Sequence, residues 1–508
     1  MRDRPVSFRP YFLRPCFPFS LNLWRQAIFS AMYASFTLSS QGQHSVALEL
    51  IQQTAAREGN LSTTALSTPY YANGSVYYRN GDPSIPQEQN GVYRDGTLIL
   101  SPGQEIDDAG TCCAPQPSGS DGTTIIMSVS TNFMTDAPNR FLGSRVLISG
   151  STLTRVLDLN TPIPGLLNPR TRNIYGRSAI DGNEIAFHIN RDRFSEPPSP
   201  SGIGRVSTNG GAVSLIATEG SPVPNDGGVF IEFENSTRVA VDGPNIYFAG
   251  RAQELTGSLT GGLYRSTAGN LTTVVDSSMP RPGGGTFSFL DFERSDIEAE
   301  GSVVVFSVPR GLYKSENGVL SLVSDSNNPP LGAEAGLFDF NDLSLRNGKI
   351  VFRGSRFNQF SPPQLTGIYS DFGGEVATVV DLNSDFGGRT PRSFELSCGN
   401  AWIDDNTILF GVNFADNSEA IFTASLTAIA APKLETEVVF TSPRAGTFTI
   451  PSRNGFRYEL LRSPDLSPSS SEAIIDAANG SGSPLTLDFD DRNSSSARAF
   501  FFVREIEL

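Results

Sequence analysis

Residues 284–325, GGTFSFLDFERSDIEAEGSVVVFSVPRGLYKSENGVLSLVSD, contain four short apolar runs separated by turn residues. The runs span 287–292, 303–306, 311–314 and 320–323. Each has the length of a strand and is rich in aromatic or β-branched residues, which favours β-structure. The intervening Glu300-Gly301, Pro309-Arg310-Gly311 and Glu316-Asn317-Gly318 are typical turn sequences. The stretch therefore predicts four antiparallel strands.

The turn before the second of these strands recurs seven times along the chain, at intervals of 47 to 61 residues. The seven turns are Asn73-Gly74, Asp121-Gly122, Asp181-Gly182, Asp242-Gly243, Glu300-Gly301, Asn347-Gly348 and Asp405-Asn406. Four-stranded units repeated at such a period are typical of a β-propeller. The sequence thus predicts an all-β chain with a seven-bladed propeller, with six or eight blades as the alternatives.

The last unit lacks a convincing fourth strand, although its first three are expected near 394–396, 407–410 and 420–424. Residues 45–59, ahead of the first unit, resemble a fourth strand and its exit. We therefore predict that residues 46–52 complete the last blade. This N-terminal strand would close the ring and remove the exposed edges of an open array.

Composition divides the chain into three parts. Residues 1–42 hold five arginines, one acidic residue and a mildly apolar run, which predicts a signal peptide or leader and hence a secreted or cell-surface protein. A transit peptide, or a true start near Met32, stays open. Residues 43–430 form the predicted propeller, and residues 433–508, with shorter strand units after Ala431-Pro432, predict a small C-terminal β-sandwich. No segment is apolar for long enough to span a membrane.

The chain is acidic, with a formal net charge of −15. The first 45 residues contribute +4, which leaves −19 for the remainder. An acidic surface repels phosphate, so nucleic acid and anionic membranes are not expected partners.

Cysteine and histidine offer few candidates for chemistry. The four cysteines, Cys16, Cys112, Cys113 and Cys398, are too scattered for a disulfide scaffold or a zinc site, although a vicinal disulfide between Cys112 and Cys113 stays open. With only His44 and His188 present, a multi-histidine metal centre is excluded. A Ser-His-Asp relay would need His188, for which a packing role between blades or a place at the rim is the favoured interpretation.

One loop places oxygen ligands at alternate positions, as calcium loops do: Asp381, Asn383 and Asp385. It departs from the EF-hand pattern at Phe386 and Arg392, so a solvated loop between blades is favoured. Asp488, Asp490 and Asp491 are a weaker candidate for a calcium site. We assign no catalytic, cofactor-binding or metal-ligating residue and expect no cofactor.

Paired aromatics mark the first strand of several units: Phe230 with Phe233, Phe289 with Phe292, and Phe338 with Phe340. They could be stacking platforms for sugars, but packing between adjacent sheets is favoured, because blades cover one another on both faces. The Asp/Asn-Gly turns are likewise interpreted as hairpin geometry that needs positive φ.

The repeated units contain Asp-Gly-x-x-[Ile/Val]-x-Phe-x-Gly, then Gly-[Leu/Ile]-Tyr, then Gly-x-Leu-x-x-Val-Val-Asp. In these motifs, residues 45–430 resemble tandem β-propeller repeats of uncharacterised secreted bacterial proteins. The tail, with FRYELLRSPDL at 456–466 and FFFVR at 500–504, is similar to a C-terminal β-sandwich of planctomycete and verrucomicrobial secreted proteins. That module usually has a Trp after Ser-x-Asp-Leu, and this chain has none there. Neither resemblance implies an activity.

The sequence therefore predicts a monomeric, non-catalytic binding module that recognises a protein or a polysaccharide through loops at one rim of the propeller. The alternative is a glycoside hydrolase or lyase with a carboxylate-lined or calcium-bearing central channel. An enzyme should show Asp, Glu, Arg or Tyr side chains converging in a concave axial pocket. A channel lined by small or apolar side chains would contradict the enzyme.

Overall fold

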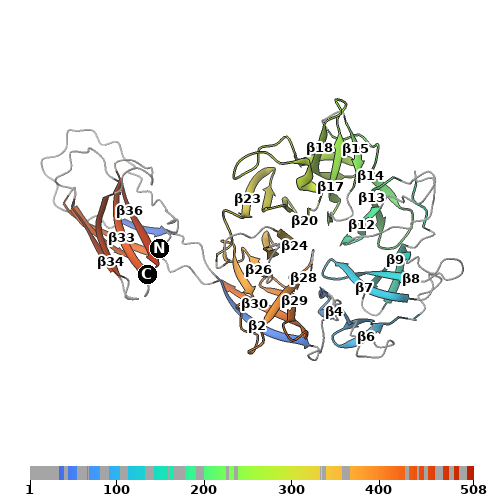
Figure 1. Ribbon diagram of the computed structural model, residues 1–508, viewed down its shortest axis with the longest axis horizontal. Coiled ribbons are helices and arrows are strands. Elements are labelled where there is room, and N and C mark those ends of the chain that lie inside the picture. Colours follow the sequence, from blue (N-terminus) through green and yellow to red (C-terminus); the bar gives the residue numbers. More distant parts are fainter. Residues whose placement is uncertain are drawn as a thin grey trace. The chain divides into compact units, whose positions relative to one another are not determined.

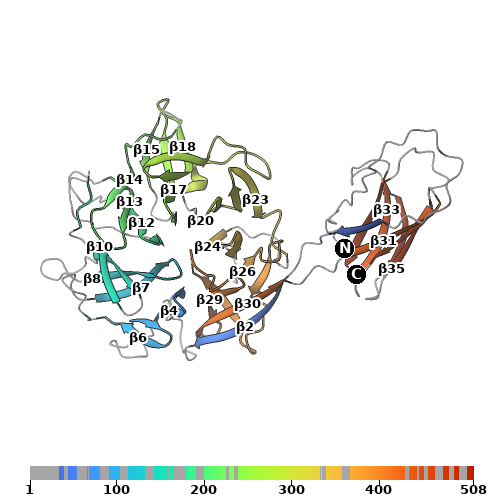
Figure 2. The same cartoon turned by 180° about the vertical axis from the view of Figure 1, so that it is seen from behind.

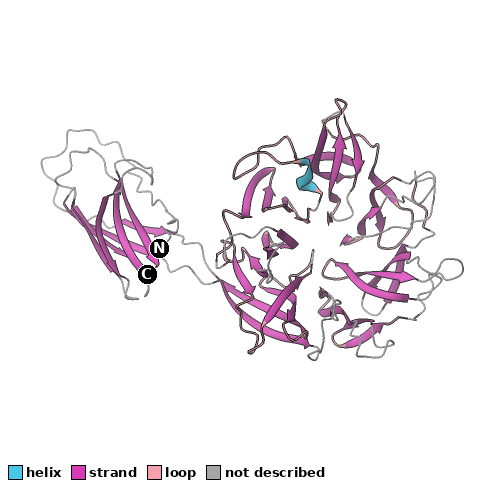
Figure 3. Ribbon diagram, viewed as in Figure 1, coloured by secondary structure: helices cyan, strands magenta, loops and turns pink. Residues whose placement is uncertain are grey.

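The computed structural model divides the chain into two compact units, Gln43–Ala428 and a second unit made of Met1–Gly42 with Ile429–Leu508. The structure describes residues 34–38, 44–53, 66, 68–80, 91–102, 104, 112–131, 142–149, 152–157, 161–164, 178–189, 200–224, 228–233, 238–293, 295–331, 333, 339–356, 366–397, 399–428, 434–442, 445–450, 456–463, 473–479, 485–490 and 500–507. These residues are almost entirely strand and loop (Figure 3). No helix among them is long and apolar enough to cross a membrane.

The unit Gln43–Ala428 is a β-propeller, with antiparallel sheets arranged around a common centre (Figure 1). Six of its sheets are each built from consecutive strands. They run from β3 (Tyr70–Ala72) to β6 (Thr97–Leu100), β7 (Cys112–Ser120) to β10 (Thr152–Leu157), β11 (Ala179–Asp181) to β14 (Ser214–Thr218), β15 (Val229–Glu232) to β19 (Asn270–Asp276), β20 (Ile297–Glu300) to β23 (Val319–Asp325) and β24 (Asp339–Arg346) to β27 (Ala377–Asp381).

In most of these sheets the first strand lies nearest the centre and the last strand lies outside, as β20 and β23 show (Figure 1). The strands between them are β4 (Ser75–Asn80), β5 (Gly91–Arg94), β8 (Ile125–Thr131), β9 (Leu142–Ser149), β12 (Glu184–Ile189), β13 (Gly202–Ser207), β16 (Val239–Asp242), β17 (Asn245–Gln253), β18 (Leu259–Thr267), β21 (Val303–Val308), β22 (Gly311–Glu316), β25 (Lys349–Ser355) and β26 (Thr366–Ser370). In the sheet β15–β19 the strand beside the axis is the second, and the first pairs with the far end of β17.

A further sheet joins the two ends of the propeller sequence. It combines β28 (Pro391–Leu396), β29 (Thr407–Phe414) and β30 (Glu419–Ala428) with β2 (His44–Gln53), which pairs with β30 from His44↔Ala428 to Gln53↔Ala420. The prediction that residues 46–52 complete the last sheet is confirmed. Val46 and Leu48 pack against the core of this sheet, whereas Ala47 between them is exposed.

Within residues 284–325, the last three predicted strands are confirmed as β21, β22 and β23, but the first is wrong. Phe289–Phe292 forms the 3-10 helix η3, and the first strand is β20. The Ser288 hydroxyl accepts from Leu290 N–H and the Asp291 carboxylate accepts from Ser288 N–H. These local hydrogen bonds compete with strand pairing. Phe287 and Phe292 are nevertheless buried against β21, as core aromatics.

Aromatic side chains fill the space between neighbouring sheets, in agreement with the packing interpretation. Phe230 and Phe233 have ring centroids 5.1 Å apart and pack in one cluster with Ala186 and Ile203 of the preceding sheet. Phe340 is also buried. Its predicted partner Phe338 lies outside the described residues.

Glycine lies within the third strand of several sheets, where close contacts and not a positive φ require it. A Cβ at Gly367 would lie 2.7 Å from Tyr369 Oη and 2.9 Å from Val380 O. At Gly262 it would lie 2.7 Å from Val275 O. The Gly-x-Tyr motif therefore lets the tyrosine ring and the fourth strand approach the backbone. The turns are different: Asn347 and Gly348 have φ of 50° and 72°, as a hairpin turn needs.

The second unit contains two sheets among its described residues. One has the order β1 (Ala34–Leu38), β31 (Leu434–Ser442), β32 (Ala445–Ile450) and β35 (Leu485–Asp490). The other has the order β34 (Ala473–Asn479), β33 (Phe456–Ser463) and β36 (Phe500–Glu507). Strands β31, β33 and β35 are labelled in Figure 2. Strand β1 falls inside the stretch predicted as a leader and pairs with β31 from Ala34↔Val438 to Leu38↔Leu434.

Candidate functional site

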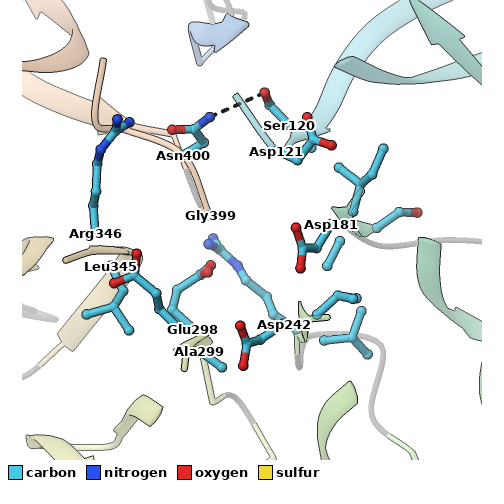
Figure 4. Close-up of a pocket in the computed structure, with 18 of the residues that line it drawn as sticks. Ser120, Asp121, Asp181, Asp242, Glu298, Ala299, Leu345, Arg346, Gly399 and Asn400 are labelled. Atoms are coloured by element: carbon cyan, nitrogen blue, oxygen red, sulfur yellow. Dashed lines mark hydrogen bonds between the residues drawn. The ribbon is translucent and has the colours of Figure 1, made fainter. Parts of the chain in front are cut away.

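The turns that follow the innermost strands surround a pocket at one end of the propeller. This axial pocket has a volume of about 380 Å³, which is in the range of small-ligand sites. Its lining comes from six successive sheets, because each innermost strand ends beside the axis (Figure 4). Lining residues include Ser120 at the end of β7, Ile180 in β11, Val241 in β16, Ala299 in β20 and Leu345 in β24.

Carboxylates dominate the charge of the axial pocket. Five acidic residues line it: Asp121, Asp181, Asp242, Glu298 and Glu300. The carboxylates of Asp181, Asp242 and Glu298 face a common space (Figure 4). Like charges around a concave opening produce a negative potential that attracts cations.

The mouth of the pocket is the ring of turns that carries the carboxylates. The two arginines of the lining do not neutralise the negative charge of these carboxylates. Arg346 Nε lies 3.3 Å from Asp405 Oδ1, and its Nη1 donates to Trp402 O at 3.3 Å. Its side chain extends away from the centre of the pocket (Figure 4). Arg238 lies deeper and is paired below the mouth.

Hydrogen bonds between neighbouring turns hold the mouth in shape. Asp181 Oδ2 accepts from Gly243 N–H at 2.5 Å, and Glu300 Oε2 accepts from Gly348 N–H at 3.0 Å. Each acid therefore binds the glycine of the next turn. These are charge-assisted bonds, stronger than neutral ones, and they connect consecutive sheets.

Asn400, after β28, connects the last sheet to earlier turns. Its amide reaches Ser120 Oγ at 3.4 Å in one orientation (Figure 4). Turned over, its oxygen accepts from Gly122 N–H at 2.7 Å and its nitrogen donates to Trp402 O at 2.8 Å, which is the better fit.

Arg238 forms the floor of the axial pocket. Its guanidinium is held by two carboxylates, with Nε 2.7 Å from Asp296 Oδ1 and Nη2 2.7 Å from Asp342 Oδ1. Arg353 Nε lies 2.5 Å from Asp342 Oδ2 on the other side. Two cations thus face two anions in a neutral cluster. The Arg238 side chain is 10 % exposed, and its Nη1 is buried without a hydrogen-bond partner among the described residues.

Glu395 in β28 is a further carboxyl near this cluster. Burial raises its pKa, and the charges of Glu419 and Asp342 raise it further, whereas hydrogen bonds from Thr68 and Asn413 lower it. The Thr68 hydroxyl donates to Glu395 Oε2 at 3.2 Å. Glu395 is not one of the residues that line the axial pocket.

The residues singled out in the sequence lie elsewhere. His188 is in β12 and 1 % exposed, and burial lowers its pKa to about 4. His44 begins β2 and is also buried, which lowers its pKa. The structure does not bring either histidine into the axial pocket.

The loop considered for calcium uses its oxygens for backbone hydrogen bonds. Asp381 Oδ1 accepts from Asn383 N–H and Asp385 Oδ1 accepts from Gly388 N–H, both at 2.9 Å. Among the described residues there is no group of three or more His, Cys, Asp or Glu that could hold a metal ion. The side chain of Asp490 and all of Asp491 lie outside the described residues, as do Cys16, Cys398 and the side chains of Cys112 and Cys113.

The sequence did not point to the axial acids as a site. In the sequence, Asp121, Asp181, Asp242 and Glu300 indicate only turns. The pattern that could have found them is an acid at the same position of four consecutive turns, because equivalent turns of a propeller meet at one axial end.

The fold and this site define a propeller protein with an acidic axial pocket. The chain belongs to a family of unknown function, DUF7453, which it matches over residues 181–456. No curated protein matches the chain.

Several solved structures resemble the chain at low identity. The Trypanosoma rangeli sialidase in complex with 2,3-difluorosialic acid shares 10% identity over 86% of this chain and 88% of that chain, with a TM-score of 0.35. The β-propeller domain of the Trilobed protease from Pyrococcus furiosus shares 12% sequence identity. The match covers 73% of this chain and 96% of that domain, with a TM-score of 0.34. An ulvan lyase of polysaccharide lyase family PL25 shares 10% sequence identity. The match covers 75% of this chain and 96% of that chain, with a TM-score of 0.34. These values carry no conclusion about substrate or chemistry.

Proposed function

We propose that this protein is a non-catalytic binding module that takes its ligand into the axial pocket. The observation that carries the proposal is the convergence of side chains from six successive sheets on one concave site of about 380 Å³. Concave sites with a few converging polar groups are the usual form of ligand sites. We further propose that the ring has seven blades, that the second unit is a β-sandwich and that the protein acts as a monomer.

A second candidate is an enzyme of the glycoside hydrolase or lyase type. The observation that favours it is the set of carboxylates around the axis, Asp181, Asp242 and Glu298, which face one another (Figure 4). Glycoside hydrolysis uses a pair of such groups. Since folds host many unrelated activities, the propeller itself does not decide between the two candidates.

The test uses calorimetric titration of short peptides and oligosaccharides against three variants. Asp242→Asn and Glu298→Gln change the pocket, and Glu316→Gln changes a half-exposed acid at the end of β22 as the matched control. A pocket ligand should bind several-fold more weakly to the first two and equally well to the control. Ligands that bind all variants equally would place recognition outside the pocket. Release of oligosaccharide products, lost in the pocket variants, would favour the enzyme.

We also propose export from the cytoplasm, supported by the arginine-rich, acid-poor residues 1–42. Expression of the full chain in a bacterial host, followed by cell fractionation and N-terminal sequencing, tests this. An exported protein should start near residue 43. A mature cytoplasmic chain that keeps residues 34–38 would contradict the proposal.

A further inference from the structure

We infer that the propeller carries a second binding surface, at the end of the sheet β15–β19 that lies away from the axial pocket. Its partner is a protein segment whose apolar side chains are flanked by lysine or arginine. This inference goes beyond the proposed function, because the axial pocket takes no part in it. The inference follows from a group of exposed apolar side chains, from the strand register that places them on one face, and from the acidic groups around them.

Exposed apolar side chains are concentrated at this end of the sheet. The residues that the structure describes include seven large apolar side chains that are exposed, and four of these belong to the sheet β15–β19 or to the adjoining helix η3. These four, called the apolar patch below, are Val229 (39 % exposed), Leu255 (88 %), Leu259 (42 %) and Leu290 (50 %). Single exposed apolar residues are ordinary on a protein surface, whereas a group with a polar rim indicates an interaction site.

The patch is remote from the axial pocket. Strand β17 starts at Asn245, close to Asp242 of the pocket lining, and ends at Gln253 beside the patch. Nine residues of extended strand cover about 25 Å. Strands β17 and β21 both begin at their turn beside the axis, but β17 has nine residues and β21 has six. The extra length of β17 therefore lies at the end that carries the patch.

Strand register places three of the four patch residues together. Gln253 of β17 pairs with Val229 of β15 on one side and with Leu259 of β18 on the other. Strands β15, β17 and β18 lie side by side in the ring (Figure 1). Residues directly opposite one another in a sheet point to the same face, so Val229 and Leu259 share a face with Gln253 between them. Leu255 follows in the hairpin that joins β17 to β18.

Helix η3 adds Leu290 to the same face. Gly261 is two residues after Leu259 in β18 and therefore points to the same side. A Cβ at Gly261 would lie 2.7 Å from Phe289 O, so the backbone of η3 lies directly over this face. The Arg251 guanidinium covers the Phe289 ring, with Cζ 5.3 Å from the ring centroid. Leu290 is left at the surface and continues the patch from Leu259.

The surroundings of the patch are acidic. Arg251 Nη1 lies 2.8 Å from Glu232 Oε2 and 3.3 Å from Glu293 Oε1, so two carboxylates share one guanidinium. Glu254 and Asp291 are the sequence neighbours of two patch leucines. Four carboxylates against one guanidinium give a surplus of three negative charges among the described residues around the patch. A partner with basic residues beside its apolar side chains complements this surface.

The same charges disfavour two other occupants. A second copy of the chain, docked patch to patch, would bring equal carboxylates face to face, and like charges at an interface are costly. An anionic membrane would bring phosphates to the acidic rim. Arg294, which lies outside the described residues, would leave the surplus negative if it were added to the count.

The test measures binding of the end-blocked peptide LKKLLKLLKKLLKL to the full chain by fluorescence anisotropy, beside its counterpart LEELLELLEELLEL. As a helix, each peptide presents leucines on one side and charges on the other. We expect the lysine peptide to bind at least about tenfold more tightly than the glutamate peptide, and 500 mM NaCl to weaken its binding several-fold. The double variant Leu255→Ser, Leu290→Ser should weaken binding about 5- to 20-fold, because a few apolar contacts carry most of the binding free energy.

Two matched controls accompany the double variant. Val319→Ser should leave binding unchanged, because Val319 is 70 % exposed in β23 and is not part of the patch. Asp242→Asn should also leave it unchanged, because Asp242 lines the axial pocket. Both patch leucines are at least half exposed, so their replacement spares the core, and circular dichroism checks that each variant is folded.

Other outcomes overturn the inference. If the lysine peptide does not bind, or binds the double variant as tightly as the wild type, the patch is not a docking surface. If Asp242→Asn weakens binding instead, the peptide occupies the axial pocket, so this inference fails while the proposed function stands. Equal binding of the glutamate peptide contradicts the charge argument. Dimerisation in sedimentation velocity, or flotation with phosphatidylserine vesicles, that is lost in the double variant would assign the patch to a second copy or to a membrane.

Discussion

Arg238 Nη2 lies 2.7 Å from Asp342 Oδ1, although the two residues belong to sheets that are not neighbours. The sheet β20–β23 lies between them in the ring and contributes Asp296, 2.7 Å from Nε of the same guanidinium. Sheets that are not adjacent can touch only close to the axis. One arginine therefore holds three sheets together at the floor of the pocket.

Replacement of Arg238 by methionine should strongly destabilise the propeller. Removing one partner of a buried ion pair leaves the remaining charges unpaired, which costs about 3–5 kcal/mol. Urea denaturation measures the free energy of unfolding. The matched control is Arg346→Met, because Arg346 Nε lies 3.3 Å from Asp405 Oδ1 where the side chains are 36% and 70% exposed. Such a pair contributes less than about 1 kcal/mol. Equal losses in the two variants would contradict the role given to Arg238.

Gly367→Ala should destabilise the sheet β24–β27 by about 1–3 kcal/mol. Its added methyl group would lie 2.7 Å from Tyr369 Oη and 2.9 Å from Val380 O, so the ring or the outer strand has to move. Gly411→Ala is the control in another strand, because its nearest contact would be an ordinary 3.5 Å to Glu395 Cβ. Thermal unfolding should separate the two variants. A loss of stability in Gly411→Ala as large as in Gly367→Ala would rule out the steric explanation.

Much of the propeller could be predicted because its turns and strands carry local chemistry. The Asp/Asn-Gly turns need positive φ, and the second and third strands hold apolar runs, so β21 and β22 were located from residues 303–314. The role of β2 could also be predicted, because a unit without a fourth strand leaves an edge that another strand has to cover.

The first strand and the floor of the pocket could not be predicted from the sequence, for different reasons. Phe287 and Phe292 are buried as strand residues would be, but hydrogen bonds of Ser288 and Asp291 turn the backbone into η3. The pocket needs side chains from sheets that are far apart in sequence. Arg238 and Asp342 are separated by 104 residues, and no local pattern announces their contact.

Leu48→Asp should weaken the closure of the ring, whereas Ala47→Asp should not. Leu48 faces the core of the last sheet and Ala47 faces solvent, on the same strand β2. Leu48→Asp removes a partly buried apolar group and places a charge against the core. It should therefore lower the free energy of unfolding by about 2–4 kcal/mol. Hydrogen exchange of β30 amides reports the effect locally. Equal protection of β30 in the two variants would show that the inward face of β2 does not contribute to closure.

Asp371 should make the propeller less stable as pH rises through 6. Its Oδ1 accepts from Ile350 N–H at 2.6 Å. Burial raises the pKa of this carboxyl to about 6 from 3.8, against the hydrogen bond from Ile350 and the charges of Lys314 and Lys349. Between these two values the folded protein holds a proton that the unfolded chain has released. The stabilisation is therefore complete below about pH 4 and is lost as pH rises through about 6.

Asp371→Asn removes this titration and keeps an oxygen for Ile350 N–H. Relative to the wild type, the variant should gain about 2 kcal/mol in free energy of unfolding between pH 4 and 7.5, since two pKa units correspond to about 3 kcal/mol and the group keeps some solvent contact. Urea denaturation at four pH values measures the difference. Asp95→Asn is the control, because Asp95 accepts from Val76 N–H at 2.7 Å in the same arrangement but is exposed. If the free energies of unfolding of Asp371→Asn and the wild type change with pH in parallel, Asp371 does not titrate in this range.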